Sequence, residues 1–265
     1  MKYPDACGPH APEGTRHTDS VKRRRVIRTA CCLVAVCGAA LACCLYFGLL
    51  QCNYPSPERF PIRGVDVSHH QGEIDWPLLA AQNIRFVYMK ATEGGDFQDP
   101  RFVRNWVEAR KAGLAVGAYH FFRSEKTGAE QAQNFIRTVP VEPDALPPVL
   151  DVECPVVPPG KERDAIRARI AECLERLATH YGKTPVLYTT YEAYEAYILG
   201  DCTGYPLWIR SVFTKPDEAA LERDWLLWQF SSRMRLRGYS GPERYIDVNV
   251  FNGKEDAFLR FQHNR

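Results

Sequence analysis

The stretch PPVLDVE at residues 147–153 ends in two carboxylates, Asp151 and Glu153, and predicts a short buried strand. Side chains alternate between the faces of a strand, so Val149, Asp151 and Glu153 share one face. Two like charges at this spacing in a dry cleft raise the pKa of at least one of them. A carboxyl group that keeps its proton can act as general acid at a bond that needs protonation to break. An isolated Asp-x-Glu can also be a strand end whose acids face water, so the rest of the chain has to decide.

Strand-like and helix-like segments alternate through the body of the chain, residues 62–265. Short apolar runs rich in Val, Ile, Phe and Tyr predict the strands, and apolar residues at helical spacing predict the helices between them. Asp75 and Thr127 are predicted helix caps, and Gly182 is a predicted helix end. The expected strands are residues 62–68, 85–92, 114–122, 147–153, 185–189, 206–209, 226–230 and 245–250, and the expected helices start at residue 76 or cover residues 100–112, 127–136 and 161–181.

Repeated strand–helix units predict an α/β fold with a mainly parallel sheet. About eight strands in one domain of about 200 residues favour a (βα)8-like barrel of the TIM type. We expect this barrel to be irregular, because the helices become short after Tyr191. A doubly wound open sheet is the alternative, but no GxGxxG follows the first strand. Catalytic groups of such barrels sit at the carboxyl ends of the strands.

Acids, aromatic residues and one histidine recur at these predicted strand ends, which is harder to explain as chance than one Asp-x-Glu. Asp66, Asp151 and Asp247 share a strand face with small or polar neighbours, as side chains pointing into a barrel mouth should. The candidates at strand ends or just beyond are Asp66, Glu93, Tyr119, His120, Asp151, Glu153, Tyr188, Trp208, Trp228 and Asp247.

The amino-terminal segment has a different character from the body. Residues 29–50 carry no charge and are long enough to cross a bilayer as one helix. Basic residues precede this run, so we expect residues 1–28 to be a basic cytoplasmic segment and the body to lie on the outer side, periplasmic or extracellular. Residues 51–61, rich in proline and polar groups, predict a linker to a catalytic domain at 62–265. A cleaved or lipidated signal remains the alternative to a single-pass anchor.

Charge and cysteine usage exclude several classes of protein. Residues 1–28 carry a net charge of +4, which leaves −2 for residues 29–265 and no basic stripe for nucleic acid. Seven of the ten cysteines lie in the first 52 residues, so the body is not a disulfide scaffold. The body has no CxxC pair with zinc spacing, and His69-His70 beside Asp66 is a weak alternative for a metal site. We therefore expect neither a metal nor a cofactor.

A set of short motifs runs through the body of the chain. The motifs are GVDVS at 64–68 with HQG at 70–72, KATEG at 90–94, GL at 113–114 with GAYHF at 117–121, DVE at 151–153, WQF at 228–230, and DVN at 247–249 with FNG at 251–253. In order and spacing they resemble glycoside hydrolase family 25, the Chalaropsis-type lysozymes, which are N-acetylmuramidases that cut peptidoglycan. The resemblance covers residues 62 to about 262 and leaves out residues 1–61.

The resemblance implies roles for the acids of an irregular barrel with an acidic groove. Glu153 matches the general acid of the family. Asp151 matches its partner, which acts as nucleophile or orients the acetamido group of the substrate, and the nucleophile stays open here. Asp66 and Asp247 match two further acids at the floor of the groove, and Tyr119 matches a tyrosine near the cleaved sugar.

Further substrate contacts are expected along the groove. Tyr188, Trp208 and Trp228 correspond to aromatic residues that line it, and Glu93 and His120 are additional candidates at strand ends. One departure stands out: after the tryptophan at 208 the family continues with a small residue and then an aromatic one, whereas this chain continues Ile-Arg-Ser-Val at 209–212. This departure affects the sugar or peptide contacts at that rim and leaves the acid pair intact.

The sequence thus predicts a monomeric bacterial peptidoglycan hydrolase, held in the membrane through residues 29–50. It would cut the β-1,4 bond between N-acetylmuramic acid and N-acetylglucosamine with retention, because two carboxylates on one strand face lie close together. A glycan-binding barrel with little activity is the second class, and a membrane-anchored scaffold for a protein partner is the third. The presence of Glu153 together with three aspartates favours the enzyme.

Overall fold

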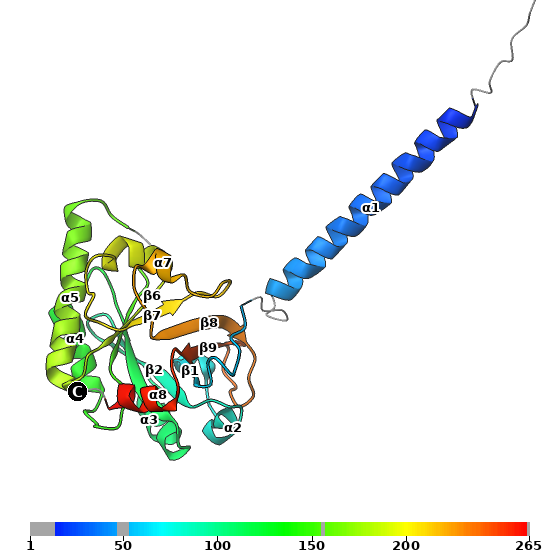
Figure 1. The fold of residues 1–265 in the computed structure, drawn as a ribbon. Helices are drawn as coiled ribbons and strands as arrows, with labels where there is room; N and C mark the ends of the chain where they lie inside the picture. Colours follow the sequence, from blue (N-terminus) through cyan, green and yellow to red (C-terminus); the bar gives the residue numbers. More distant parts are fainter. Residues whose placement is uncertain (1–13, 47–52, 155–156, 264–265) are drawn as a thin grey trace, which may run out of the picture. The chain divides into compact units, whose positions relative to one another are not determined.

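The computed structural model describes residues 14–46, 53–154 and 157–263 (Figure 1). The chain forms two compact units, residues 1–50 and 51–265. The first contains helix α1, Gly14–Tyr46, in which Arg23–Cys44 has a mean hydropathy of 2.1 and is long enough to cross a membrane. This segment lies nearer the amino terminus than the predicted span at 29–50, whose last residues, 47–50, fall outside the described part of the chain. A signal sequence has the same length and composition, so the anchor remains a prediction.

The second unit is built on a closed barrel, as the sequence predicts. The strand order is β1-β9-β8-β7-β6-β5-β4-β2-β3, and an additional pairing of β1 with β2 closes the sheet. The short β3 pairs only with the end of β2, so it lies outside the ring. The strands are β1 Arg63–Val67, β2 Phe86–Glu93, β3 Phe97–Gln98, β4 Ala115–Phe121, β5 Val149–Val152, β6 Val186–Thr189, β7 Leu207–Arg210, β8 Leu227–Met234 and β9 Ile246–Phe251.

Strand β9 makes the barrel irregular. It runs antiparallel to both of its neighbours, β8 and β1, whereas the strands from β1 through β2 and β4 to β8 are parallel. Asp247 is therefore near the amino end of its strand and not at a carboxyl end, which corrects the sequence interpretation. It still faces the site because it lies opposite Asp66 in the β1–β9 register.

Helices cover the outside of the barrel and begin where the sequence places their caps. The Asp75 carboxylate accepts a hydrogen bond from the Leu78 amide at 3.0 Å, and Thr127 forms a capping box with Glu130. Helix α5 ends at Gly182 in the left-handed region, with φ 61°. The helical segments are η1 His69–Gln71, α2 Trp76–Ala80, α3 Phe102–Lys111, α4 Gly128–Thr138, α5 Lys161–Tyr181, α6 Tyr191–Ala193, the π-helical η2 Tyr194–Ile198, α7 Glu218–Leu221 and α8 Glu255–Gln262.

Large aromatic rings fill the inside of the barrel away from the site. A Cβ at Gly64 would lie 2.3 Å from the Phe86 ring, and one at Gly117 would lie 2.2 Å from the Tyr88 ring, so both glycines make room for these rings. Helix α8 closes this end of the barrel with Phe258, whose ring centroid is 5.6 Å from that of Phe86. The polar side chains that point into the barrel therefore lie at its other end, opposite α8.

The segment predicted as a linker, residues 51–61, is packed against the barrel where the structure describes it. The Asn53 amide donates to the carbonyl oxygens of Ser211 at 3.0 Å and of Phe230 at 3.1 Å. Phe60 is buried among the outer aromatic residues of β8 and the chain before it. The packed domain therefore includes residues from Asn53 onward, which corrects the predicted boundary at residue 62.

Candidate active site

A cavity of about 170 Å³ opens at the carboxyl ends of the parallel strands. Alternation in β5 is as predicted, because Val149, Asp151 and Glu153 line this cavity while Leu150 and Val152 lie in the outer core. The structure thus brings together all four predicted catalytic acids. The lining residues are Asp66, Ser68, His70, Lys90, Tyr119, Phe121, Val149, Asp151, Glu153, Tyr188, Trp208 and Asp247.

Two amides hold the carboxylate of Asp66 at the cavity floor. Asn249 Nδ2 donates to Asp66 Oδ2 at 2.7 Å, and Gln229 Nε2 donates to the same oxygen at 3.1 Å. Burial raises the pKa of Asp66 to about 6, and the two amides and Asp247 act against this rise. Near neutral pH Asp66 is therefore held as an anion by donors that face it from β8 and β9.

Asp151 and Asp247 are the acids most affected by burial. Desolvation raises the pKa of both carboxyl groups well above the usual range, and neighbouring acids raise it further. Asp247 shares a hydrogen bond with Asp66, which fits a protonated Asp247 beside an ionised Asp66. Asp151 is 7% exposed, and its Oδ1 has no hydrogen-bond partner among the described residues. This free oxygen at the cavity wall is available to a bound substrate.

Glu153 is two residues beyond Asp151, just past the end of β5, and lines the cavity. Desolvation raises its pKa, while the Arg210 guanidinium and the Tyr188 hydroxyl act in the opposite direction. The direction is the one that a general acid needs, because a raised pKa keeps the proton on the carboxyl group nearer to neutral pH. Asp151 and Glu153 thus both face the cavity, as their spacing predicts, although Glu153 follows the last residue of β5.

Lys90 is a cavity residue that the sequence reasoning missed. Its ammonium group pairs with the Glu93 carboxylate and lies 4.9 Å from the Phe121 ring centroid and 5.4 Å from that of Phe97. Its charge lowers the pKa of Asp151 against the stronger effect of burial. Lys90 has the same parity along β2 as Phe86 and Tyr88, which both fill the barrel, and this alternation could have identified it.

Glu93 lies beside the site and does not line the cavity. Its carboxylate pairs with Lys90 and with Arg123, and these two cations lower its pKa against the effect of desolvation. We therefore correct its predicted role from substrate contact to support of Lys90.

Three of the predicted aromatic residues do line the cavity, namely Tyr119, Tyr188 and Trp208. The Tyr188 hydroxyl donates to Gln229 Oε1 at 2.9 Å, which orients the amide that donates to Asp66. The Trp208 indole donates to Asn249 Oδ1 at 3.0 Å and orients the second amide in the same way. Tyr188 and Trp208, which are both buried, therefore fix the acid floor, while the half-buried Tyr119 offers a ring face on which a sugar can stack.

Trp228 is not part of the cavity, which corrects the prediction that it contacts substrate. It is 2% exposed and packs in the outer core against the rings of Phe60, Trp225 and Phe230. Its indole donates to the Ser211 carbonyl at 2.8 Å. Adjacent residues of a strand face opposite ways, so Gln229 points inward and Trp228 outward. The tryptophan thus fixes the chain that follows β7.

His120 is also placed outside the cavity, under helix α4. It is fully buried, with Nδ1 2.7 Å from Thr92 Oγ1 and Nε2 3.1 Å from Gln131 Oε1. The Gln131 amide nitrogen faces three carbonyl oxygens, so its Oε1 must accept and His120 Nε2 must donate. Nδ1 then accepts from Thr92, and the imidazole is neutral with both nitrogen atoms satisfied. Its predicted substrate contact is therefore wrong.

We expect His120 to make the barrel sensitive to acid. Burial lowers its pKa from 6.5 to about 4, so below pH 6.5 the unfolded chain binds a proton that the folded chain does not. The free energy of unfolding should then fall by up to about 3 kcal/mol from this group between pH 6.5 and pH 4. In urea titrations, His120→Leu should be less stable than the unaltered chain at pH 6.5, and this difference in the free energy of unfolding should shrink as the pH is lowered to 4. A deficit that stays constant with pH would contradict this expectation.

The two histidines considered as metal ligands have other surroundings. His69 Nδ1 lies 2.8 Å from Asp99 Oδ2, and the His69 backbone amide donates to the same oxygen at 2.9 Å. His70 lines the cavity, and its ring centroid is 4.0 Å from that of His69. Within the part of the chain that the structure describes, no group of three or more His, Cys, Asp or Glu residues is arranged to hold a metal ion.

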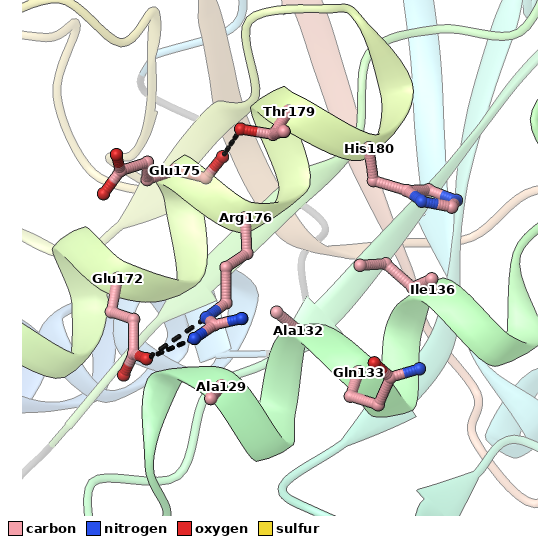
Figure 2. Close-up of a pocket in the computed structure, with 9 residues that line it drawn as sticks. All are labelled: Ala129, Ala132, Gln133, Ile136, Glu172, Glu175, Arg176, Thr179 and His180. Carbon is pink, nitrogen blue, oxygen red and sulfur yellow. Dashed lines mark hydrogen bonds and ion pairs between the residues drawn. The ribbon is translucent and has the colours of Figure 1, made fainter.

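A larger hollow of about 770 Å³ lies between α4 and α5, on the outside of the barrel (Figure 2). On α5, Arg176 Nη2 forms an ion pair with Glu172 Oε1 at 3.0 Å. Ala129, Ala132, Gln133 and Ile136 of α4 form the facing wall. Glu175, Thr179 and His180 are exposed on α5, whereas the four predicted catalytic acids converge on the smaller cavity.

A barrel that presents a carboxylate pair at the carboxyl edge of its parallel strands is typical of glycoside hydrolases. The comparisons with known proteins agree. The family model for Glycosyl hydrolases family 25 matches residues 65–239, and the chain belongs to this family.

Relatives in sequence and structure span most of the second unit. "Uncharacterized protein YegX" of Escherichia coli K12 is 35% identical over 77% of this chain and 75% of its own length. "Lysozyme M1" of Streptomyces globisporus is 31% identical over 77% of this chain and 72% of its own. A family 25 glycosyl hydrolase from Bacillus anthracis superposes with a TM-score of 0.72 at 45% identity, covering 78% of this chain and 96% of that one. The bacterial lysozyme from Streptomyces coelicolor superposes with a TM-score of 0.64 at 31% identity, covering 76% of this chain and 97% of that one.

Proposed function

We propose that this chain is a peptidoglycan hydrolase that cuts the β-1,4 bond between N-acetylmuramic acid and N-acetylglucosamine. The observation that carries the proposal is the convergence of Asp66, Asp151, Glu153 and Asp247 on one cavity of a family 25 barrel. Relatives named as lysozymes give the substrate class. Desolvation and mutual repulsion supply the proton-holding environment that glycosidic cleavage requires.

Glu153 is the proposed general acid. A glycosidic bond breaks through an oxocarbenium-like transition state, so the leaving oxygen needs a proton as the bond lengthens. Glu153 lines the cavity just beyond the carboxyl end of β5, two residues after Asp151, where we expect a polymer to reach it. The raised pKa of Glu153 favours the protonated form, and Arg210 and Tyr188 keep the rise moderate, so that the group can also release its proton.

Asp151 is the proposed partner of Glu153. The two residues are separated by two positions on one strand, so their Cα atoms are about 6.5–7 Å apart and their carboxyl groups can approach more closely. Such proximity favours retention of configuration. The unpartnered Oδ1 of Asp151 can either attack the anomeric carbon or hold the acetamido nitrogen while the acetamido oxygen attacks. Lys90 favours the ionised form that either role uses.

The pair of Asp66 and Asp247 has a different proposed role at the floor. The ionised Asp66 is held by Asn249 and Gln229, and its negative charge faces the position where positive charge develops on the sugar ring. The same charge raises the pKa of Asp247, which adds one proton to the floor. We propose that this pair stabilises the oxocarbenium-like state and takes no part in bond formation.

We further propose that helix α1 holds the enzyme at the outer face of a bacterial membrane, on the evidence of its length and the basic residues before it. Protease treatment of intact cells or spheroplasts should then degrade residues 62–265, while a label confined to the cytosol should not reach them. Protection from the protease together with cytosolic labelling would contradict this location. Amino-terminal sequencing of the mature protein distinguishes an anchor from a cleaved signal.

The reaction itself is tested with purified peptidoglycan. The full chain in mild detergent should release fragments whose new reducing ends, read by mass spectrometry after borohydride reduction, are muramic acid. New glucosamine ends would keep a glycosidase and overturn the bond assignment. Tight binding to peptidoglycan without any release would favour the glycan-binding barrel.

A further inference from the structure

Arg210 is a cation near Glu153 whose charge moderates the pKa of that acid and whose hydrogen-bond donors the catalytic scheme does not use. It is the last residue of β7 and follows Trp208 at a spacing of two, so it shares the inward face with this cavity-lining residue. In the parallel register it pairs with Gln229, the residue that donates to Asp66. Arg210 therefore stands above the wall that Trp208 and Gln229 form, between the cavity and solvent.

The backbone around Arg210 is fixed on both sides. The amide of Ser211 donates to the Gln229 carbonyl at 3.0 Å, and the Ser211 carbonyl accepts from the Trp228 indole at 2.8 Å. The Asn53 amide donates to the same carbonyl at 3.0 Å. The guanidinium is thus carried by a rigid strand end rather than by a loose loop, which suits a group that must meet a ligand in one place.

The guanidinium acts on the acids of the site through its charge, which lowers the pKa of Glu153 and of Asp247. Arg210 is half-buried, and its side chain forms no hydrogen bond or ion pair with another residue in the described part of the chain. The other cation of the site, Lys90, is bound to Glu93. Of these two cations, Arg210 is therefore the one with donors left for a ligand, and its planar fork matches a carboxylate in a two-bonded geometry.

The acidic lining of the cavity would repel an anionic ligand, and the donors of Arg210 can offset this repulsion. Four acids converge there, and a substrate that carries a carboxylate would be repelled by them unless a cation compensates. Muramic acid bears a lactyl ether whose carboxyl group is either free or extended by a peptide stem that carries carboxylates of its own. A neutral sugar in the cavity has no such requirement.

Resting on the proposed function, we infer that Arg210 determines specificity by binding a carboxylate carried on the lactyl arm of muramic acid. The sugar ring occupies the cavity, and the arm projects past Trp208 toward the end of β7. The carboxylate belongs either to the lactyl group itself, in strands without stems, or to the stem peptide. In both cases the guanidinium selects muramic acid over an unsubstituted glucosamine residue.

The experiment measures binding, so that hydrolysis is not required. In the full chain in detergent, Glu153→Gln is compared with the double variant Glu153→Gln, Arg210→Gln, and with Glu153→Gln, Arg260→Gln as control for an exposed arginine on α8. The probes are glycan strands with intact stems, strands stripped of stems by an amidase, and stripped strands whose lactyl carboxylates are converted to neutral methylamides. Kd is measured for each pair.

We expect loss of Arg210 to weaken binding to carboxylate-bearing strands by about 10- to 100-fold, the range of a charge-assisted pair, and to leave methylamide strands unchanged. Weakening confined to stripped strands identifies the lactyl carboxylate, and weakening confined to stem-bearing strands identifies the stem. The inference would be overturned if the variants with and without Arg210 had equal Kd values on every carboxylate-bearing strand. It would also be overturned if loss of Arg210 weakened binding to methylamide strands to the same extent, or if no strand bound at all. If the unaltered chain releases no muramic ends while binding still depends on Arg210, the hydrolase is refuted and the inference stands.

Discussion

Replacing Glu153 with glutamine should lower kcat for peptidoglycan by about 10²- to 10⁴-fold, the contribution of a positioned general acid. The amide has nearly the same shape but no acidic proton, so the leaving oxygen departs unprotonated. Kd for glycan strands should change little, because the substitution leaves the aromatic walls and Arg210 in place. Rates are measured by the appearance of reducing ends, with Glu162→Gln on the exposed first turn of α5 as the matched control.

A substrate with a better leaving group sharpens this test. An aryl glycoside of the same disaccharide releases a phenolate that needs no protonation, so Glu153→Gln should lose far less activity on it than on peptidoglycan. Equal losses on both substrates would assign Glu153 to binding or folding. Retention of full activity on peptidoglycan would remove Glu153 from the mechanism.

Asp151→Asn should also reduce kcat by at least about 10²-fold, since it removes the charge that either proposed role requires. The two roles differ in their intermediates. A nucleophilic Asp151 forms a glycosyl ester that a slow fluorinated substrate can trap and peptide mapping can place on this residue. An orienting Asp151 gives no adduct, and the enzyme should then fail on strands whose acetamido groups are removed. Unchanged kcat would contradict both roles, and Asp96→Asn at an exposed position serves as the control.

The same substitution should have the opposite effect on stability. Burial holds the pKa of Asp151 well above the range of the unfolded chain, so between these two pKa values the folded state binds more protons. Stability from this group is present in acid and lost as pH rises through the folded pKa. Asparagine cannot ionise and so avoids the free-energy cost of a buried carboxylate. The melting temperature of Asp151→Asn relative to the unaltered chain should therefore increase from pH 4 to pH 8. A difference that falls or stays flat would show that the carboxyl group is not strained by burial.

Much of the fold was predictable because the strands are short, apolar and separated by capped helices. The reversal of β9 was not predicted, since strand propensity is independent of strand direction. A signal was present: no helical pattern lies between the strands now seen as β8 and β9, and a connection without a helix favours a hairpin. That reversal explains why Asp247 faces the cavity from the beginning of its strand.

The site was predictable where one strand face was plainly apolar. Leu150 and Val152, which alternate with the two acids, set the alternation, and Asp151 and Glu153 were placed accordingly. Tyr119-His120 and Trp228-Gln229 are adjacent pairs in which both residues suit a polar cavity, so composition could not tell which faced inward. The long reach of lysine and arginine likewise hides their direction in a sequence.

The closure of the barrel by α8 has a consequence for how a long polymer is degraded. Phe258 and Phe261 seal the end opposite the acids, so no strand can thread through the molecule from one side to the other. For the proposed hydrolase, a glycan then lies across the mouth, and both products leave on the side where the substrate arrived. We therefore expect cuts at internal positions, so that the average polymer length falls early in a digest, well before small fragments accumulate.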